Sequence, residues 1–91
     1  MKKRCHVIYS GRVQGVGFRY TARALADKYH LSGWVMNLSD GGVALEVEGK
    51  TKDLDNLLCD LQDEFKDYIK GIDLNELPYS GEYNDFRIRF Y

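Results

Sequence analysis

The feature that most constrains the fold is a β-hairpin in the middle of the chain. The segment Ser39 to Gly42 contains Asp-Gly, a strong signal for a tight turn between antiparallel strands. Trp34 to Asn37, before this turn, is typical of a strand. After the turn, apolar side chains alternate with small or acidic ones, as in a strand with one buried face: Val43, Leu45 and Val47 against Ala44, Glu46 and Glu48. The sequence therefore predicts two antiparallel strands of a larger sheet.

Two segments with helical periodicity flank this hairpin. From Phe18, apolar and small residues recur at the spacing of one helix face: Phe18, Ala22, Leu25, Ala26 and Tyr29. The stretch Leu31 to Gly33 signals the end of this helix. Further along, another apolar stripe recurs at helical spacing among acidic residues: Leu54, Leu58, Leu61 and Phe65. Both helices are amphipathic, so each is expected to pack on a flat surface.

Three further segments are expected to be strands. They are Cys5 to Ser10, the less regular Ile69 to Leu77, and the end of the chain, where Phe86, Ile88 and Phe90 alternate with Arg87, Arg89 and Tyr91. The predicted order is β-α-β-β-α-β. With one polar face per strand, it indicates an α+β, ferredoxin-like sandwich whose mostly antiparallel sheet carries both helices on one face. At 91 residues, we expect a single domain over residues 1–91.

A glycine-rich loop lies between the first strand and the first helix. Gly11, Gly15 and Gly17 allow backbone conformations that other residues resist, so this loop can turn its amides inward. A helix begins with unpaired N–H groups, and the loop contains no Ser, Thr, Asp or Asn that would cap them. An external anion is the natural substitute, although the same glycines are also compatible with a simple tight turn.

Arg19 strengthens the anion interpretation. A cation in the first turn of a helix lies at the positive end of the helix dipole, where it is unfavourable. A guanidinium group can hold two phosphate oxygens at once, which would explain its position. Gly11 to Arg19 is therefore predicted to be a phosphate-binding loop that continues into a helix, with a solvated surface arginine as the alternative.

Two long motifs in the chain resemble the signature regions of acylphosphatases. They are GRVQGVGFR at Gly11 to Arg19 and GWVMN at Gly33 to Asn37, the second followed by Gly41, Val43 and Gly49. With the order of helices and strands, the resemblance covers essentially the whole chain. Many vertebrate members carry a bulkier residue at the position of Gly17, so the sequence is similar to the bacterial type.

The resemblance implies a reaction and a set of residues that perform it. The reaction is hydrolysis of a small acyl phosphate to a carboxylate and inorganic phosphate, with no cofactor and no metal ion. Arg19 matches the phosphate-binding arginine of the family, and Asn37 matches the asparagine that positions the attacking water. The backbone amides that match the phosphate cradle belong to Gln14, Gly15, Val16, Gly17 and Phe18.

The residue types suit this chemistry. Fixed N–H donors and Arg19 would stabilise the charge that spreads over a transferring phosphoryl group. The amide oxygen of Asn37 can accept a hydrogen bond from water and hold it in line for attack. We therefore predict direct attack by water, with the proton passing to the substrate phosphate or to solvent. The alternative for Asn37 is a strand-end residue that bonds its own turn.

The remaining polar residues indicate no second site. Cys5, Cys59, His6 and His30 show no metal-ligand spacing, so we expect no metal site and two structural histidines. Without an export signal, we expect reduced thiols and a cytoplasmic location, although a disulfide stays open. No apolar stretch is long enough to span a membrane.

Two other functions are compatible with parts of the sequence. The run GVGFRY distantly echoes the glycine-aromatic motif of RNA-binding modules, but Phe18 and Tyr20 fall at the start of a helix rather than on a central strand. A net charge of -1 also gives no general attraction for nucleic acid or an acidic membrane. A non-catalytic domain that binds carbamoyl phosphate within a larger maturation enzyme is the third possibility. We expect a monomer without nucleic-acid or membrane partners.

Overall fold

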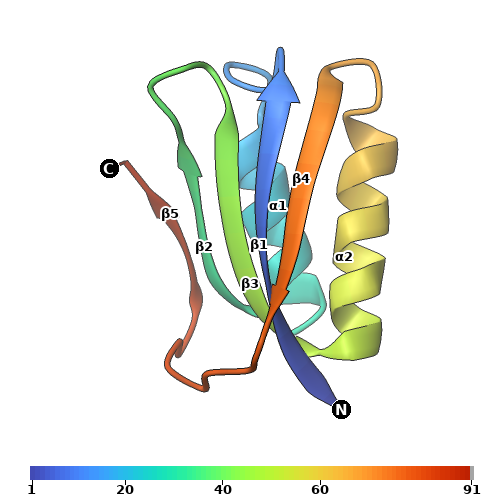
Figure 1. The fold of residues 1–91 in the computed structure, drawn as a ribbon, viewed down its shortest axis with the longest axis vertical. Helices are drawn as coiled ribbons and strands as arrows, with labels where there is room; N and C mark the ends of the chain where they lie inside the picture. Colours follow the sequence, from blue (N-terminus) through green and yellow to red (C-terminus); the bar gives the residue numbers. More distant parts are fainter. Residues whose placement is uncertain (91) are drawn as a thin grey trace.

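The fold is a five-stranded sheet with two helices on one face (Figure 1). A computed structural model describes residues 1–90. Its elements are β1 (Lys2–Gly11), α1 (Phe18–Lys28), β2 (Ser32–Asn37), β3 (Val43–Lys50), α2 (Thr51–Glu64), β4 (Ile69–Leu77) and β5 (Phe86–Arg89). The strand order is β4-β1-β3-β2-β5, and all neighbours are antiparallel except β2 and β5. The predicted ferredoxin-like sandwich is confirmed.

The strand predicted at the end of the chain adds a fifth strand to the β-α-β-β-α-β order. β5 pairs in parallel with β2, with Gly33 opposite Phe86 and Val35 opposite Ile88. It ends at Arg89, so Phe90 lies beyond the strand and is 72% exposed. Tyr91, which the alternation assigned to this strand, lies outside the described residues.

The core fills the space between the sheet and the helices. Its aromatic centre is a row of three rings, Tyr9, Phe18 and Phe65, with centroid distances of 4.9 and 4.8 Å. Phe18 is the first residue of α1 and is only 2% exposed, so the core anchors the start of this helix beside the end of β1. In α2 the fully buried residues are Leu54, Leu57 and Leu61, whereas Leu58, predicted on this stripe, is only partly buried.

β3 is buried on both faces, which differs from the expectation of one polar, solvated face. Glu46 is 9% exposed and Glu48 is 2% exposed. The reason is the chain path: β4 and β5 lie at opposite edges of the sheet, so residues 78–85 cross from one edge to the other (Figure 1). This stretch, the crossing segment, covers the two carboxylates on the side of the sheet away from the helices.

Glu48 binds the crossing segment through both of its carboxylate oxygens. Its Oε1 accepts hydrogen bonds from the Ser80 backbone N–H at 3.0 Å and from Ser80 Oγ at 2.8 Å. Its Oε2 accepts one from the Gly81 backbone N–H at 3.0 Å. These three bonds compensate for the burial of the carboxylate.

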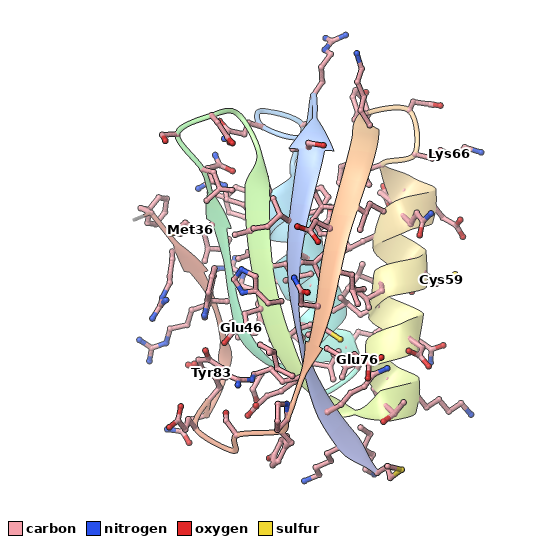
Figure 2. The ribbon with its side chains drawn as sticks, in the orientation of Figure 1. Met36, Glu46, Cys59, Lys66, Glu76 and Tyr83 are labelled. Carbon is pink, nitrogen blue, oxygen red and sulfur yellow. The ribbon has the colours of Figure 1, made fainter. Side chains whose placement is uncertain are left out.

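Glu46 forms a second polar cluster on the same face. Its carboxylate accepts a hydrogen bond from the Tyr83 hydroxyl, and Figure 2 shows both residues on the side away from the helices. His6 Nδ1 lies 2.9 Å from Glu46 Oε1, and Arg4 forms an ion pair with Glu46 at 3.4 Å. Burial alone would raise the pKa of Glu46, but the hydrogen bonds from Tyr83 and His6 and the charge of Arg4 outweigh it and lower that pKa. His6 therefore has a carboxylate partner that no sequence spacing indicated.

The two cysteines and the lengths of the helices can also be compared with the sequence-based expectations. Cys5 is buried in β1 and Cys59 is exposed on α2, and both are free thiols. Burial raises the pKa of the Cys5 thiol. Within residues 1–90 neither helix has the length and apolar character needed to cross a membrane.

Candidate active site

The glycine loop, residues 12–17, joins the end of β1 to the start of α1. Gly11 begins the turn with a φ of +116°, and a Cβ there would lie 2.3 Å from the Tyr68 carbonyl oxygen. Only glycine fits this position. The next residue, Arg12, donates its backbone N–H to the same carbonyl at 2.9 Å. The loop is thereby attached to the segment that precedes β4.

The loop ends in an uncapped helix start. Gly15 and Gly17 have φ values of +75° and +84°, in the left-handed region. Gly17 is the N-cap residue of α1, no side chain among residues 1–90 caps this end, and the first turn contains no acidic residue. The predicted absence of a cap is confirmed. The first N–H groups of α1 therefore have no side-chain cap and lie at the positive end of the helix dipole, where an anion would be favoured.

A cavity of about 230 Å³ lies at this end of the molecule. It is lined by Val13, Gly15, Gly17, Phe18, Arg19, Tyr20 and Asn37. The structure thus brings together the loop, the first turn of α1 and the last residue of β2, and with them five of the seven predicted site residues. Gln14 and Val16 do not line the cavity: the Gln14 side chain bonds the turn between β2 and β3, and Val16 packs partly buried against the core.

Two lining residues were not predicted from the sequence. Val13 is 1% exposed and adds an apolar side chain to the cavity lining, while Tyr20 is 59% exposed. Tyr20 directly follows Arg19, and its position in the first helical turn is the only signal that could have indicated it.

Arg19 is half-buried in the cavity wall. Its guanidinium carbon lies 5.4 Å from the centre of the Phe90 ring, a distance that allows a cation–π contact. Arg19 is not a member of any ion pair formed among residues 1–90. Its positive charge is therefore not neutralised by the acidic side chains of the described chain.

Asn37 presents a buried polar atom without a partner. Its side-chain oxygen Oδ1 is the only buried side-chain nitrogen or oxygen among residues 1–90 that forms no hydrogen bond. The turn that follows is closed by other groups: the Leu38 N–H donates to the Gly42 carbonyl at 2.8 Å, and the Gly42 N–H donates to Asp40 Oδ1 at 2.9 Å. Asp40 therefore performs the turn-closing role considered for Asn37. An unpaired acceptor of this kind is costly, and it points to a bound group as its partner.

Comparison with known proteins agrees with this geometry. A sequence model of the acylphosphatase family matches residues 5–88, which include both signature regions and the whole cavity. This chain belongs to the acylphosphatase family. It is 40% identical over 92 residues to the acylphosphatase of Syntrophus aciditrophicus, an overlap of 99% of this chain and 95% of that protein.

Solved acylphosphatase structures share the whole fold. The crystal structure of acylphosphatase from Bacillus subtilis superposes with a TM-score of 0.88 at 32% identity, covering 99% of this chain and 100% of that one. An acylphosphatase from Coxiella burnetii gives a TM-score of 0.84 at 33% identity, covering 97% and 93%. The chain is accordingly an enzyme of the acylphosphatase class, which hydrolyses small acyl phosphates.

The groups that line the cavity come from different parts of the chain, and they suit the binding of an acyl phosphate. Arg19 and the helix start can bind a phosphate group, since both are positive and both face the cavity. Asn37, the last residue of β2, supplies an acceptor. Within residues 1–90, no three His, Cys, Asp or Glu side chains lie close enough together to hold one metal ion.

Proposed function

We propose that this acylphosphatase cleaves its substrate by direct attack of water on phosphorus, without a metal ion or other cofactor. Asn37 positions the water, Arg19 binds the phosphate, and the backbone amides of Gln14, Gly15, Val16, Gly17 and Phe18 cradle its oxygens. The proposal is supported by one observation above all. Asn37, whose Oδ1 is buried and unpaired, lines the same cavity as Arg19 and the uncapped start of α1.

The charge of the transition state is matched by groups of the chain itself. A phosphoryl group in transfer spreads negative charge over its equatorial oxygens, and catalysis then depends on fixed donors around them. Arg19 can donate two hydrogen bonds to such oxygens. The first N–H groups of α1 lie at the positive end of the helix dipole, which favours a bound anion. Because these donors are already in place, the proposed reaction requires no additional cation.

The water is held rather than strongly activated. The amide oxygen of Asn37 accepts one hydrogen bond from the water, whose oxygen forms a bond to phosphorus. The bond between phosphorus and the acyl oxygen breaks, and its electron pair leaves on the carboxylate. The proton of the water passes to a phosphate oxygen or to solvent. A carboxylate is a stable leaving group, so no general acid is needed.

The positions of the aromatic residues favour a small substrate over RNA. Phe18 is 2% exposed in the core, and Tyr20 lies on α1 rather than on the open face of the sheet. Base-stacking residues of RNA-binding modules with this strand order lie on the sheet. We further propose that the enzyme is a cytoplasmic monomer that binds neither nucleic acid nor a membrane.

The test is turnover of benzoyl phosphate in excess chelator. We expect rapid loss of the anhydride with the parent protein, and a fall in kcat/KM of about 10²-fold or more in Arg19→Ala and in Asn37→Ala, the size of effect seen when a fixed charge-stabilising donor is removed. Arg23→Ala is the matched control, because Arg23 lies on the same helix, is exposed and does not line the cavity. A parent that is no faster than buffer, or an Arg19→Ala variant that behaves like Arg23→Ala, would contradict the proposal.

A further inference from the structure

The side chain of Gln14 spans from the glycine loop to the turn between β2 and β3. Its Nε2 donates one hydrogen bond to the Leu38 carbonyl at 2.7 Å and another to the Gly42 carbonyl at 2.8 Å. A carboxamide nitrogen carries two hydrogens, so both of its donors are used. Both bonds are short, and both acceptors are backbone atoms whose positions define the turn.

The two carbonyls are those that close this turn. The Leu38 carbonyl also accepts the Gly41 N–H at 3.2 Å, and the Gly42 carbonyl also accepts the Leu38 N–H at 2.8 Å. Gln14 therefore holds both ends of the turn at once. Leu38 directly follows Asn37, so a shift of the turn would move the residue that lines the cavity.

No other hydrogen bond performs this connection. Among residues 1–90, the two bonds of Gln14 are the only hydrogen bonds between residues 12–17 and residues 38–42. The backbone N–H of Arg12, also in the loop, donates instead to the Tyr68 carbonyl before β4. Every hydrogen bond that fixes the loop relative to the turn therefore comes from the side chain of Gln14.

We propose that Gln14 is a positioning residue that sets the place of Asn37 relative to the bound phosphate. The inference rests on the proposed function, in which Asn37 holds water in line with phosphorus. Misplacement of a reacting group by about 1 Å can cost about 10²-fold in rate. Phosphate binding depends on Arg19 and on the amides of the loop and α1, which remain when the two hydrogen bonds of the Gln14 side chain are lost. Gln14 should thus act on kcat more than on phosphate affinity.

The first test replaces Gln14 with methionine, which has a similar length and no N–H donor. We expect Gln14→Met to lower kcat for benzoyl phosphate by roughly 10–100-fold, while the inhibition constant of inorganic phosphate changes by less than about threefold. Gln62→Met is the matched control, because Gln62 is exposed on α2. A Gln14→Met variant with the kcat of Gln62→Met would overturn the inference, as would equal losses in kcat and phosphate affinity.

A double-mutant cycle separates positioning from general damage. If Gln14 acts through Asn37, adding Gln14→Met to Asn37→Ala should change kcat by less than about threefold, because the residue to be positioned is already gone. The same large factor in both backgrounds would overturn the inference. An Asn37→Ala variant with the parent's kcat would instead remove the proposed function, so the two failures are distinguishable.

Hydrogen exchange in the parent protein tests the role of Gln14 without any substitution. Both side-chain N–H hydrogens of Gln14 should exchange with solvent much more slowly than those of Gln62, since each is held in a hydrogen bond. NMR of the side-chain amides measures this directly. If the Gln14 hydrogens exchange as fast as those of Gln62, Gln14 does not hold the turn, and the inference is overturned.

Discussion

Replacing Glu48 with glutamine should destabilise the protein by about 2–4 kcal/mol. The carboxylate is 2% exposed and accepts three hydrogen bonds from Ser80 and Gly81 in the crossing segment. A glutamine can keep only one of its two terminal atoms as an acceptor, so its NH₂ group must face at least one N–H donor. One charge-assisted bond, worth about 1.5–3 kcal/mol, is then lost, and the two that remain become weaker neutral bonds. Relief from burying a charge offsets part of this cost.

Thermal unfolding followed by circular dichroism measures the effect. For a domain of this size each kcal/mol lowers Tm by roughly 4–8 °C, so we expect a decrease of about 8–32 °C. Glu64→Gln is the matched control: Glu64 is exposed at the end of α2, and its substitution should change stability by no more than about 0.5 kcal/mol. Below its melting temperature Glu48→Gln should retain the parent's kcat, because Asn37 pairs with Val43 at the other end of β3. Equal melting temperatures for the two variants would refute the view that Glu48 anchors the crossing segment.

Three further predictions concern other parts of the structure. Because the folded-state pKa of Glu46 is lowered from 4.5, its stabilisation is fully present above that pH and is lost as the pH falls through the folded pKa. The advantage of the parent over Glu46→Gln in free energy of unfolding should therefore shrink as the pH falls below about 4.5, and a difference independent of pH would contradict this. Asn37→Ala should lose activity but keep or raise Tm, since it removes a buried unpaired oxygen; a Tm lower by more than about 5 °C would count against that interpretation. Gly33→Ala should not fold, because its Cβ would lie 2.0 Å from the Glu46 carbonyl oxygen. Gly17→Ala should fold and cost only about 1–2 kcal/mol of left-handed strain, because a Cβ there meets nothing within 4 Å. Two folded variants with similar free energies of unfolding would show that the close contact at Gly33 does not matter.

Much of the fold could be predicted because its signals are local. The Asp-Gly turn and the alternation beyond it determine the hairpin of β2 and β3, and the apolar stripe from Phe18 predicts α1 from its first residue. Arg19 and the absence of a cap were equally readable, since both concern a single helix start. That Arg19 and Asn37 would line one cavity came from the family resemblance rather than from periodicity.

The rest depends on segments that are distant in the sequence. Glu48 alternates with apolar residues like any solvent-facing position, and its burial follows from the path of residues 78–85 across the sheet. His6 and Glu46 meet because β1 pairs with β3 in one particular register. The bonds of the Gln14 side chain are equally non-local, because their acceptors lie on a turn more than twenty residues further along the chain. No local spacing encodes such contacts.

The fate of solvent oxygen distinguishes attack of water on phosphorus from attack on the carbonyl carbon. Hydrolysis of benzoyl phosphate in H₂¹⁸O, with chelator present and the products analysed by mass spectrometry, reports which atom the water attacks. Attack on phosphorus in the cavity of Arg19 and Asn37 predicts one ¹⁸O atom in each phosphate and none in benzoate. Label in benzoate would place the attack at the carbonyl carbon, and it would contradict the proposed mechanism.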